Sequence, residues 1–554
     1  MSLRQDPVGP VPEETARVAR AAFPRGNAWM RLRDELGPIY DDDTFAALFS
    51  QRGRPAEAPW RLALISVMQF AERLSDRRAA DAVRGRIDWK YALGLPLDDP
   101  GFDSTVLCEF RARLLQGGAE QQLLDALLTI ARERGWLHAR GRQRTDSTHV
   151  LAAIRAHNRV ETVRETLRHA LNVLAELAPD WLLQHAESDW AERYGRTWDD
   201  DRLPTSQEER DQVVATVGAD GVKLLTAVYA DDTPVELRGV SAIEILRRVW
   251  LQNYVPTDVG VRWRTTADGL PPAMRFISSP YDLEAHYAVK RNRSWVGYKV
   301  HLTETCDADL PNLITHIETT LAPVTDWDAT PLIHEALARS TLLPSEHLVD
   351  LGYVDADLLV ASRRDFEVDL IGPAKPDLHW QAREKTGFAS ECFTIDWDRE
   401  QATCPEGRGS VSWSPLVDNR RTDVIKIWFS AKDCRPCPSR DKCIRSSGGR
   451  SPRRLLTIRR QAAYEALQAA RQRQQTRSFA TLYARRSGIE GTVSQAVRTC
   501  AIRRTRYRGL RKTHLDHVAT AAALNCLRLG DWLAERPRAK TRSSPFARLV
   551  ADRS

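Results

Sequence analysis

Several signals that would assign this chain to a well-known class are missing from its sequence. No run approaches the ~20 consecutive apolar residues of a membrane-spanning helix, and the first residues lack the apolar core of a secretory signal. Neither G-x-x-x-x-G-K-[ST] nor G-x-G-x-x-G occurs, which argues against an NTPase or a Rossmann dehydrogenase. We therefore expect a cytoplasmic protein that uses neither a membrane nor an NTP.

Lysine is also scarce, and the positive charge is concentrated toward the C-terminus. Of the 81 basic residues only 11 are lysines. Residues 451–554 carry 23 basic and 6 acidic residues, a net of +17, whereas residues 1–450 carry 58 and 68, a net of −10. A basic segment of this kind indicates a polyanionic partner, and arginine forks bind phosphate well. A solvated basic face is the alternative, and a GC-rich genome would also favour arginine.

The length of 554 residues, with 42% hydrophobic and 28% charged residues, predicts a globular protein of two to four domains. Hydrophobic periodicity and composition divide it into an all-α N-terminal segment (1–135), a segment of alternating strands and helices (136–375) with a helical insertion at about 155–270, a Cys-rich insertion (376–452), a second helical segment (453–535) and a disordered basic tail (536–554). The alternation predicts an α/β fold with a mixed sheet flanked by helices. The helix pair predicted at 59–74 and 76–87 is either a helix-turn-helix or only a packing unit.

Three acidic residues stand where an α/β protein places its site. Strands are predicted at 141–145, 294–304, 312–319, 347–350 and 368–371. Asp146 ends the first of these strands and Asp350 ends the fourth, so both carboxylates would lie at one edge of the sheet. Glu490 follows Tyr483 and Arg486 at a spacing that puts all three on one face of a helix. Such a set can hold two Mg²⁺ or Mn²⁺ ions roughly 3.5–4 Å apart, although each acid taken singly is more often a cap or a salt-bridge partner.

Four of the nine cysteines fall close together in the Cys-rich insertion. Cys404, Cys434, Cys437 and Cys443 include a C-x2-C pair, which supplies two of the four ligands of a tetrahedral zinc site from one tight turn. The sequence therefore predicts one structural Zn²⁺, with Cys392 as a possible replacement ligand. Unliganded buried thiols and redox chemistry remain open alternatives.

The order of these features resembles the DDE transposases of bacterial insertion sequences. The matching segments are 145–150 (TDSTHV), 279–285 (SPYDLEA), 295–301 (WVGYKVH), 350–353 (DLGY), 488–492 (GIEGT) and 503–509 (RRTRYRG). The helical segment before the core is similar to the transposase N-terminal domain, so the resemblance covers about residues 20–535. It implies a DNA-binding N-terminal domain and an RNase H-like catalytic core in which Asp146, Asp350 and Glu490 bind divalent metal.

The resemblance further implies cleavage at transposon ends and strand transfer into target DNA, with double-stranded DNA as partner and a homodimer on that DNA, at the nucleoid. The candidate DNA contacts are Tyr483, Arg486, Arg498, Arg503, Arg504, Arg506, Arg508, Lys512 and Lys299. The family's frame often continues to a lysine at the position of Val497, and here the nearest cation is Arg498. Two alternatives remain, an RNase H-like nuclease without strand transfer and a catalytically inactive zinc-containing DNA-binding protein.

Overall fold

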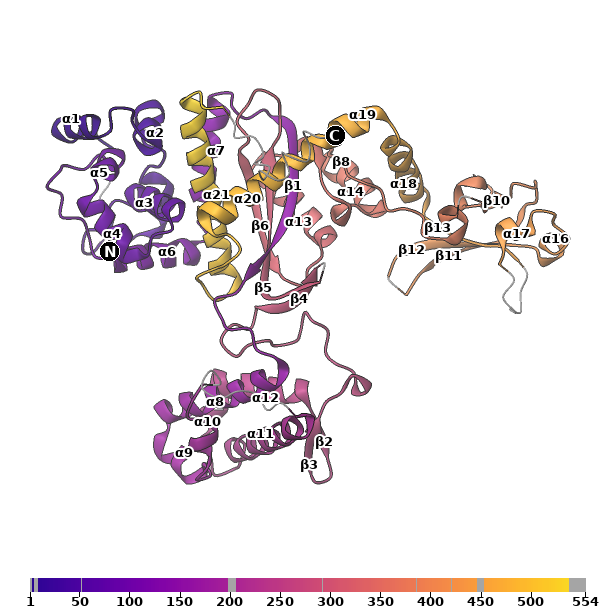
Figure 1. Ribbon diagram of the computed structural model, residues 1–554, viewed down its shortest axis with the longest axis horizontal. Helices are drawn as coiled ribbons and strands as arrows, with labels where there is room; N and C mark the ends of the chain where they lie inside the picture. The colour runs from indigo at the N-terminus through magenta and orange to yellow at the C-terminus, as the bar shows by residue number, and fades with distance from the viewer. Residues whose placement is uncertain are drawn as a thin grey trace, which may run out of the picture.

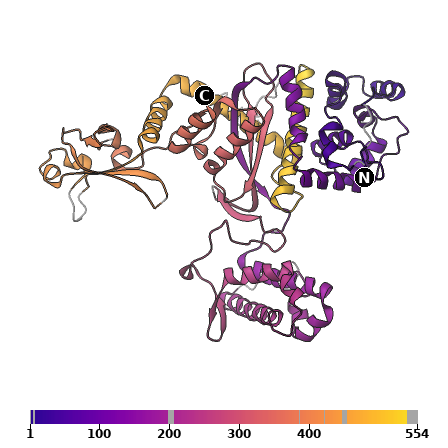
Figure 2. The ribbon, with the colours of Figure 1, turned by 180° about the vertical axis from the view of Figure 1, so that it is seen from behind.

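A six-stranded mixed sheet stands at the centre of the computed structural model (Figure 1). The N-terminal helices lie along one side of it, a helical lobe lies beyond one end of the strands, and a slender arm extends from the other side (Figures 1 and 2). The structure describes residues 2–3, 8–50, 52–197, 206–290, 292–384, 386–419, 421–445 and 453–537. The predicted basic tail therefore lies outside the described residues, except for its first two positions.

The sheet is mixed, as predicted. Its strands are β1 (Arg140–Leu151), β4 (His286–Lys290), β5 (Arg293–Thr305), β6 (Ile314–Leu321), β7 (Pro344–Leu348) and β8 (Asp369–Ile371). β5 pairs antiparallel with β1, β4 and β6, whereas β1, β7 and β8 run parallel to one another. The expected α/β class, an RNase H-like mixed sheet with flanking helices and an N-terminal helical region, is confirmed.

β1 is longer than predicted, and Asp146 lies in its middle. The strand continues past Asp146 to Leu151 because it pairs with β5 over most of its length, from Gln143 opposite Thr305 to Leu151 opposite Gly297. The prediction that Asp146 ends a strand was therefore wrong. The prediction ended the strand at the polar Asp-Ser-Thr stretch because it used only local sequence. In the structure, the partner strand β5 continues to hydrogen-bond with the backbone of β1 beyond this stretch.

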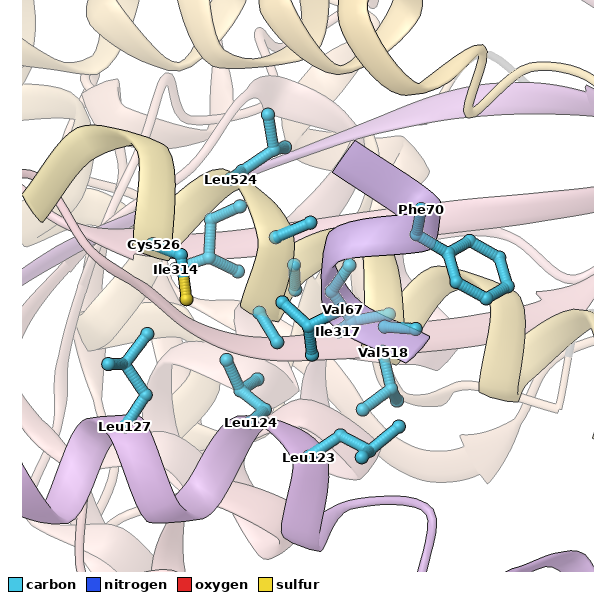
Figure 3. Close-up of a cluster of buried hydrophobic side chains, with 14 of the residues drawn as sticks. Val67, Phe70, Leu123, Leu124, Leu127, Ile314, Ile317, Val518, Leu524 and Cys526 are labelled. Atoms are coloured by element: carbon cyan, nitrogen blue, oxygen red, sulfur yellow. The ribbon is translucent and has the colours of Figure 1, made fainter. Parts of the chain in front are cut away.

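The N-terminal helices and the sheet share one hydrophobic core. The helices are α1 (Glu13–Ala22), α2 (Ala28–Leu36), α3 (Pro59–Glu72), α4 (Asp76–Gly85), α5 (Ile87–Leu93), α6 (Thr105–Gly117) and α7 (Gln122–Glu133). α3 is buried along almost its whole length, and Ser75 caps α4 by accepting the backbone N–H of Arg78 at 3.3 Å. Side chains of α3 and α7 meet β6 in a single cluster (Figure 3).

The helix that joins these two parts is α21 (Leu510–Leu533), which packs against β6, α2, α3 and α7. It is buried on every side over most of its length, as expected for a helix enclosed between a sheet and other helices. Within it the Asn525 amide pairs with the edge of β6, accepting the N–H of Ile314 and donating to its carbonyl, both at 2.8 Å. Among the helices of the described residues, none combines the length and the hydrophobicity that a membrane-spanning segment needs.

The helical insertion forms a lobe with its own core. Its elements are α8 (Arg159–Leu177), α9 (Pro179–His185), α10 (Trp190–Tyr194), α11 (Gln207–Val228), α12 (Ser241–Asn253) and the hairpin β2 (Tyr254–Thr257) and β3 (Gly260–Trp263). The buried apolar residues of these elements form a cluster separate from the main core. The lobe is therefore a body of its own, attached at the end of β1 and before β4 (Figure 1).

The Cys-rich segment forms the arm. It contains β9 (Thr394–Asp396), β10 (Gln401–Thr403), β11 (Ser410–Val417), β12 (Asp423–Phe429), β13 (Leu455–Arg459) and the short helices α15 (Trp380–Arg383), α16 (Ala431–Cys434) and α17 (Arg440–Cys443). The helices α13 (Asp326–Arg339) and α14 (Ala356–Phe366) precede it, and α18 (Gln461–Gln474), α19 (Arg477–Ala484) and α20 (Gly488–Cys500) follow. Within the predicted helical segment 453–535, α18 and α19 are separate helices, because the Thr476 hydroxyl caps α19 by accepting the N–H of Phe479 at 3.2 Å.

A buried ion-pair network fastens the C-terminal helices to the sheet. Glu304 on β5 is fully buried and accepts from Arg144 Nε of β1 at 2.8 Å and Arg528 Nη1 of α21 at 2.8 Å. It also accepts the Thr492 hydroxyl of α20 at 2.6 Å. One carboxylate therefore holds two strands and two helices together.

Replacing Glu304 by alanine should lower the free energy of unfolding by about 3–5 kcal/mol, because Arg144 and Arg528 would remain buried without their carboxylate. Urea unfolding measures the change. The control is Glu335→Ala, an exposed glutamate of α13, with an expected loss below about 0.5 kcal/mol. Equal stability of the two variants would contradict the assigned role of Glu304.

Candidate active site

The parallel pairing of β1 with β7 brings Asp146 and Asp350 to the same level of the sheet. It sets Arg144 opposite Leu348, and each aspartate comes two residues later in its own segment. Asp146 is still inside β1, whereas β7 has ended and Asp350 begins a turn by accepting the N–H of Gly352 at 2.8 Å. The register alone therefore aligns the two predicted acids.

Glu490 approaches the same place on α20, and Gly488 permits the approach. The Arg144 guanidinium donates to the carbonyl of Arg485, just before α20 begins. A Cβ on Gly488 would overlap that guanidinium. The glycine is thus required because α20 lies directly against the arginine that links it to β1.

Arg486 lies among the three carboxylates. Its Nη2 is 2.7 Å from Asp146 Oδ2 and 4.0 Å from Asp350 Oδ2, and its Nη1 is 3.4 Å from Glu490 Oε1. The structure therefore brings all three predicted acids within 4.0 Å of one guanidinium, although they come from positions up to 344 residues apart in the chain.

The cluster is buried at the sheet and open toward α20. The side chains of Asp146 and Asp350 are 17% and 27% exposed, whereas that of Glu490 is 68% exposed. Burial raises the pKa of Asp146, the Arg486 charge acts against this, and the charge of Asp350 adds to it. The environment therefore opposes ionisation of the deepest acid.

Tyr483 lies beside this cluster on α19. Its ring stacks on that of Phe479, with centroids 5.3 Å apart and planes 10° from parallel. Burial raises the pKa of its hydroxyl, and the nearby acids add to the rise while Arg486 opposes it. Tyr483 therefore remains a neutral hydroxyl next to the acids.

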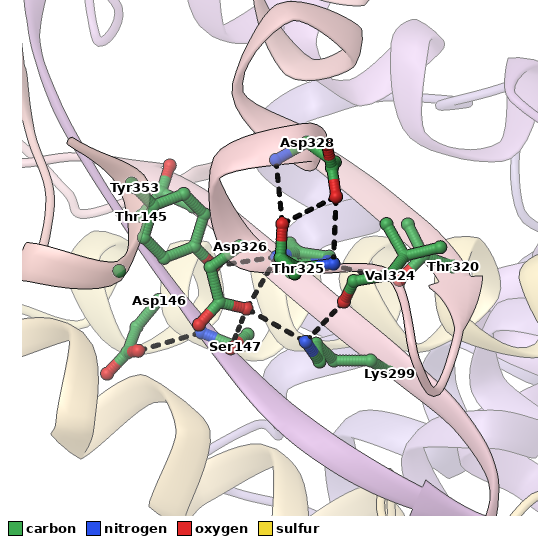
Figure 4. A network of polar contacts seen from close by, with 12 residues as sticks. Thr145, Asp146, Ser147, Lys299, Thr320, Val324, Thr325, Asp326, Asp328 and Tyr353 are labelled. Carbon is green, nitrogen blue, oxygen red and sulfur yellow. Dashed lines mark hydrogen bonds and ion pairs between the residues drawn. The ribbon is translucent and has the colours of Figure 1, made fainter. Parts of the chain in front are cut away.

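Sequence reasoning missed a fourth carboxylate, Asp326, at the start of α13 (Figure 4). Its Oδ1 accepts the Ser147 hydroxyl at 3.0 Å and Lys299 Nζ at 3.2 Å, and its Oδ2 accepts Lys290 Nζ at 3.2 Å. Although burial acts to raise it, the charges of Lys299 and Lys290 hold the pKa of Asp326 below its usual value.

Asp326 is also close to Asp350. A Cβ built on Gly352 would lie 3.0 Å from a carboxylate oxygen of each. The sequence signal was the capping box of Thr325 and Asp328, which marks the start of a helix. The capping box does not indicate that Asp326 faces the site, because the side chains that contact Asp326 come from other segments.

Lys299 is buried, whereas a residue that contacts DNA must lie on the surface. Its Nζ donates to the carbonyl of Val324 at 2.6 Å as well as to Asp326, and the residue is 8% exposed. The sequence prediction of a DNA contact at Lys299 is therefore not supported by its position. Lys290, with a side chain 46% exposed, is the more accessible lysine at this edge.

The other predicted DNA contacts lie along the end of α20, the connection to α21 and the start of α21. Exposed residues among them are Arg498, Arg504, Arg506, Arg508 and Lys512. Arg503 is half-buried and donates from Nε to the Thr148 hydroxyl at 2.8 Å, Arg506 donates to the carbonyl of Leu74 at 2.9 Å, and the Arg508 guanidinium lies over the Tyr281 ring. This basic run therefore touches the sheet, the N-terminal helices and the segment that leads out of the insertion.

The four predicted zinc ligands line one small cavity of about 30 Å³ in the arm, and Cys392 does not line it. Cys404 accepts the backbone N–H of Arg408 on its sulfur at 3.3 Å, at the turn that follows β10. Burial raises the pKa of Cys443 to about 11, Arg454 opposes this rise, and the neighbouring thiols Cys437, Cys404 and Cys434 add to it. The four thiols are thus mutual neighbours.

The side chains of the carboxylate cluster and of the four cysteines are of types that bind metal ions. In neither place, however, do they adopt the geometry of metal ligands. Carboxylate oxygens suit Mg²⁺ and Mn²⁺, and four thiols suit Zn²⁺. Across the described residues, no group of three or more His, Cys, Asp or Glu has the arrangement of a metal site. At the carboxylates, the Arg486 guanidinium lies among the oxygens that such ions would bind.

Two family models match the chain. The model described as Transposase DDE domain matches residues 403–530, which include the four cysteines and Glu490. The model described as Transposase domain (DUF772) matches residues 18–113, within the N-terminal helices. No curated protein matches the sequence.

Asp146→Asn should make the protein more stable at neutral pH. The folded protein holds the pKa of this carboxyl above its ordinary value of 3.8, so folding becomes less favourable as the pH rises from 3.8 through the folded pKa. An amide removes that cost, and the advantage should grow from about pH 4 to pH 8. Urea midpoints over this range provide the test, and a variant that is less stable at pH 8 would contradict it.

Proposed function

We propose that this chain, which belongs to the DDE transposases of insertion sequences, cuts DNA at the ends of its element and joins the freed 3′ ends to target DNA. A DDE domain implies a nucleic-acid-processing enzyme that depends on a divalent metal, with DNA as its partner. The observation that carries the finer proposal is the convergence of Asp146, Asp350 and Glu490 on one point beside a basic surface.

In this proposal Asp146, Asp350 and Glu490 hold two Mg²⁺ or Mn²⁺ ions. When bound, such ions lower the pKa of an attacking water and stabilise the leaving 3′ oxygen. Arg486 and the Tyr483 hydroxyl lie next to the acids, where they would donate hydrogen bonds to the non-bridging oxygens of the phosphate and orient it. Asp326 would position Lys290, which it already binds, at the rim of the same site.

Strand transfer would use the same groups. The freed 3′ hydroxyl attacks a target phosphorus, and one new phosphorus–oxygen bond forms as one target bond breaks. The number of phosphodiester bonds is unchanged, so the step requires neither an NTP nor a covalent protein intermediate. A phosphate held by Arg486 and Tyr483 would stay aligned for this second attack.

The DNA backbone is proposed to run along the basic connection between α20 and α21. Arg504, Arg506, Arg508 and Lys512 are exposed there, and such side chains position a duplex by contacting its phosphates. Arg498 projects from the last turn of α20 on the same stretch of chain. Because two element ends must be held together, we propose a homodimer on DNA that works at the nucleoid.

We further propose that Cys404, Cys434, Cys437 and Cys443 bind one structural Zn²⁺ in the arm. Their position around a single small cavity supports this. The backbone N–H of Arg408 would remain as an outer hydrogen bond to the Cys404 sulfur when the metal is bound. Zinc binding would displace the thiol protons, which the raised pKa of Cys443 otherwise retains.

Asp146→Asn and Asp350→Asn should each reduce Mg²⁺-dependent nicking of duplexes carrying the element's ends on the order of 10³-fold, with DNA binding retained. Asp328→Asn is the matched control, because this exposed acid of α13 only caps its helix. Nicking and strand transfer are scored separately. Nicking without transfer would favour a nuclease, and DNA binding without either would favour a catalytically inactive protein.

Purified protein should carry about one zinc per chain, measured by atomic emission. Cys437→Ser should lose most of it, whereas Cys108→Ser, in the N-terminal helices, should keep it. Loss of zinc on Cys392→Ser would instead make that residue a ligand. A wild-type protein that is metal-free with an unchanged fold would overturn the zinc proposal and leave buried thiols or redox chemistry as explanations.

A further inference from the structure

Arg486 makes ion pairs with all three carboxylates of the candidate site. The guanidinium contacts Asp146 and Asp350 through Nη2 and Glu490 through Nη1. Its side chain is 14% exposed, so its contacts with Asp146 and Asp350 are made largely out of water, whereas the Glu490 carboxylate is open to solvent. A cation at this position offsets the mutual repulsion of three negative charges, which is strong where the effective dielectric is low.

The guanidinium is nevertheless incompletely satisfied. Arg486 Nε is buried and has no hydrogen-bond partner among the described residues. An unpaired buried donor destabilises the arrangement that holds it. Arg486 can therefore leave the carboxylates if another partner accepts hydrogen bonds from all of its guanidinium donors. A phosphate diester is such a partner.

Arg486 also engages the oxygens that a metal ion requires. Asp146 Oδ2 is bonded to its Nη2 at 2.7 Å, and Asp146 Oδ1 accepts the backbone N–H of Ser147 at 2.8 Å. Both oxygens of this acid are thus in use. The three carboxylates lie around the guanidinium, and the described residues contain no group of three or more side chains arranged as metal ligands.

We propose that Arg486 is the internal counter-ion of the carboxylate cluster in the DNA-free protein and that it competes with the divalent ions for Asp146, Asp350 and Glu490. When DNA binds, Arg486 moves from the acids to a phosphate, and the cluster becomes available to metal. This inference rests on the proposed function and adds an order of events to it, in which DNA prepares the metal site.

The position of Arg486 in the fold allows this movement. It lies in a 3₁₀ turn, Arg485–Ser487, between α19 and α20, so its backbone belongs to a junction and not to the middle of a long helix. The preceding residue is tied to the sheet through the bond from Arg144 to the Arg485 carbonyl. A side-chain rotation at Arg486 can therefore exchange partners while α20 and Glu490 stay in position.

Thermodynamic linkage makes the proposal measurable. If DNA removes a competitor of the metal, then metal and DNA must each raise the affinity of the other by the same factor. Mn²⁺ binding is measured by electron paramagnetic resonance, with and without a duplex that ends at the cleavage position and so has no bond left to cut. In wild-type protein the duplex should strengthen Mn²⁺ binding at least about fivefold.

Arg486→Gln should bind Mn²⁺ at least about fivefold more tightly than wild type without DNA, and the duplex should add little further. Arg486→Lys keeps a cation at the cluster and should therefore bind Mn²⁺ weakly. Thermal melting of this variant shows whether it is folded. Arg477→Gln, which changes an exposed arginine at the start of α19 that is outside the proposed DNA contacts, should behave as wild type.

Mn²⁺ affinity that is the same in wild type and Arg486→Gln would overturn the counter-ion role while leaving the metal centre standing. Weaker Mn²⁺ binding by Arg486→Gln would overturn it as well, since it would show that the arginine supports the metal. Absence of Mn²⁺ binding in every protein, with and without duplex, would instead reject the proposed metal-dependent function.

Discussion

The attachment of the C-terminal helices to the sheet depends on one fully buried carboxylate, Glu304. It joins Arg144 on β1 to Arg528 on α21 and bonds Thr492 on α20. Glu490 lies only two residues before Thr492, so the place of the third acid relative to β1 follows from this network. A buried charge of this kind is stabilising only while all its partners are present, which makes the geometry of the site sensitive to each of them.

The edge of the sheet carries more negative charge than a folded protein readily tolerates. Asp146, Asp350 and Asp326 lie around Gly352 and the middle of β1, and Glu490 approaches from α20. Arginine from one side and two lysines from the other offset this charge. Burial raises the pKa of Asp146, and the negative charge of Asp350 adds to this rise although Arg486 opposes it. A charged active site lowers the stability of the protein that contains it. Substitutions that remove such a charge therefore tend to make the protein more stable and less active.

The three bodies around the sheet are attached in different ways. The N-terminal helices share the main core through α21 and β6 (Figure 3), so they form one unit with the sheet. The insertion and the arm have clusters of their own, which makes each a smaller unit on its own connections. The basic run at 503–512 lies where the sheet, the N-terminal helices and the end of the insertion come together, and a duplex bound there would contact more than one body.

Local periodicity and residue order were sufficient for the α/β class, for the helix pair α3 and α4, for five of the six strands of the central sheet, and for selecting Asp146, Asp350 and Glu490 and the four cysteines as groups. These are properties of contiguous residues, and alternation in β5 or a cap at Ser75 is readable from a short window. The full length of β1, the interior position of Lys299 and the presence of Asp326 at the site were not readable in this way. Each depends on partners brought from distant segments, as β5 is to β1 and Lys290 to Asp326. The sequence alone therefore determined which chemical groups the protein has. Only the tertiary structure decided which charges meet, because burial and ion pairing are set by residues hundreds of positions apart.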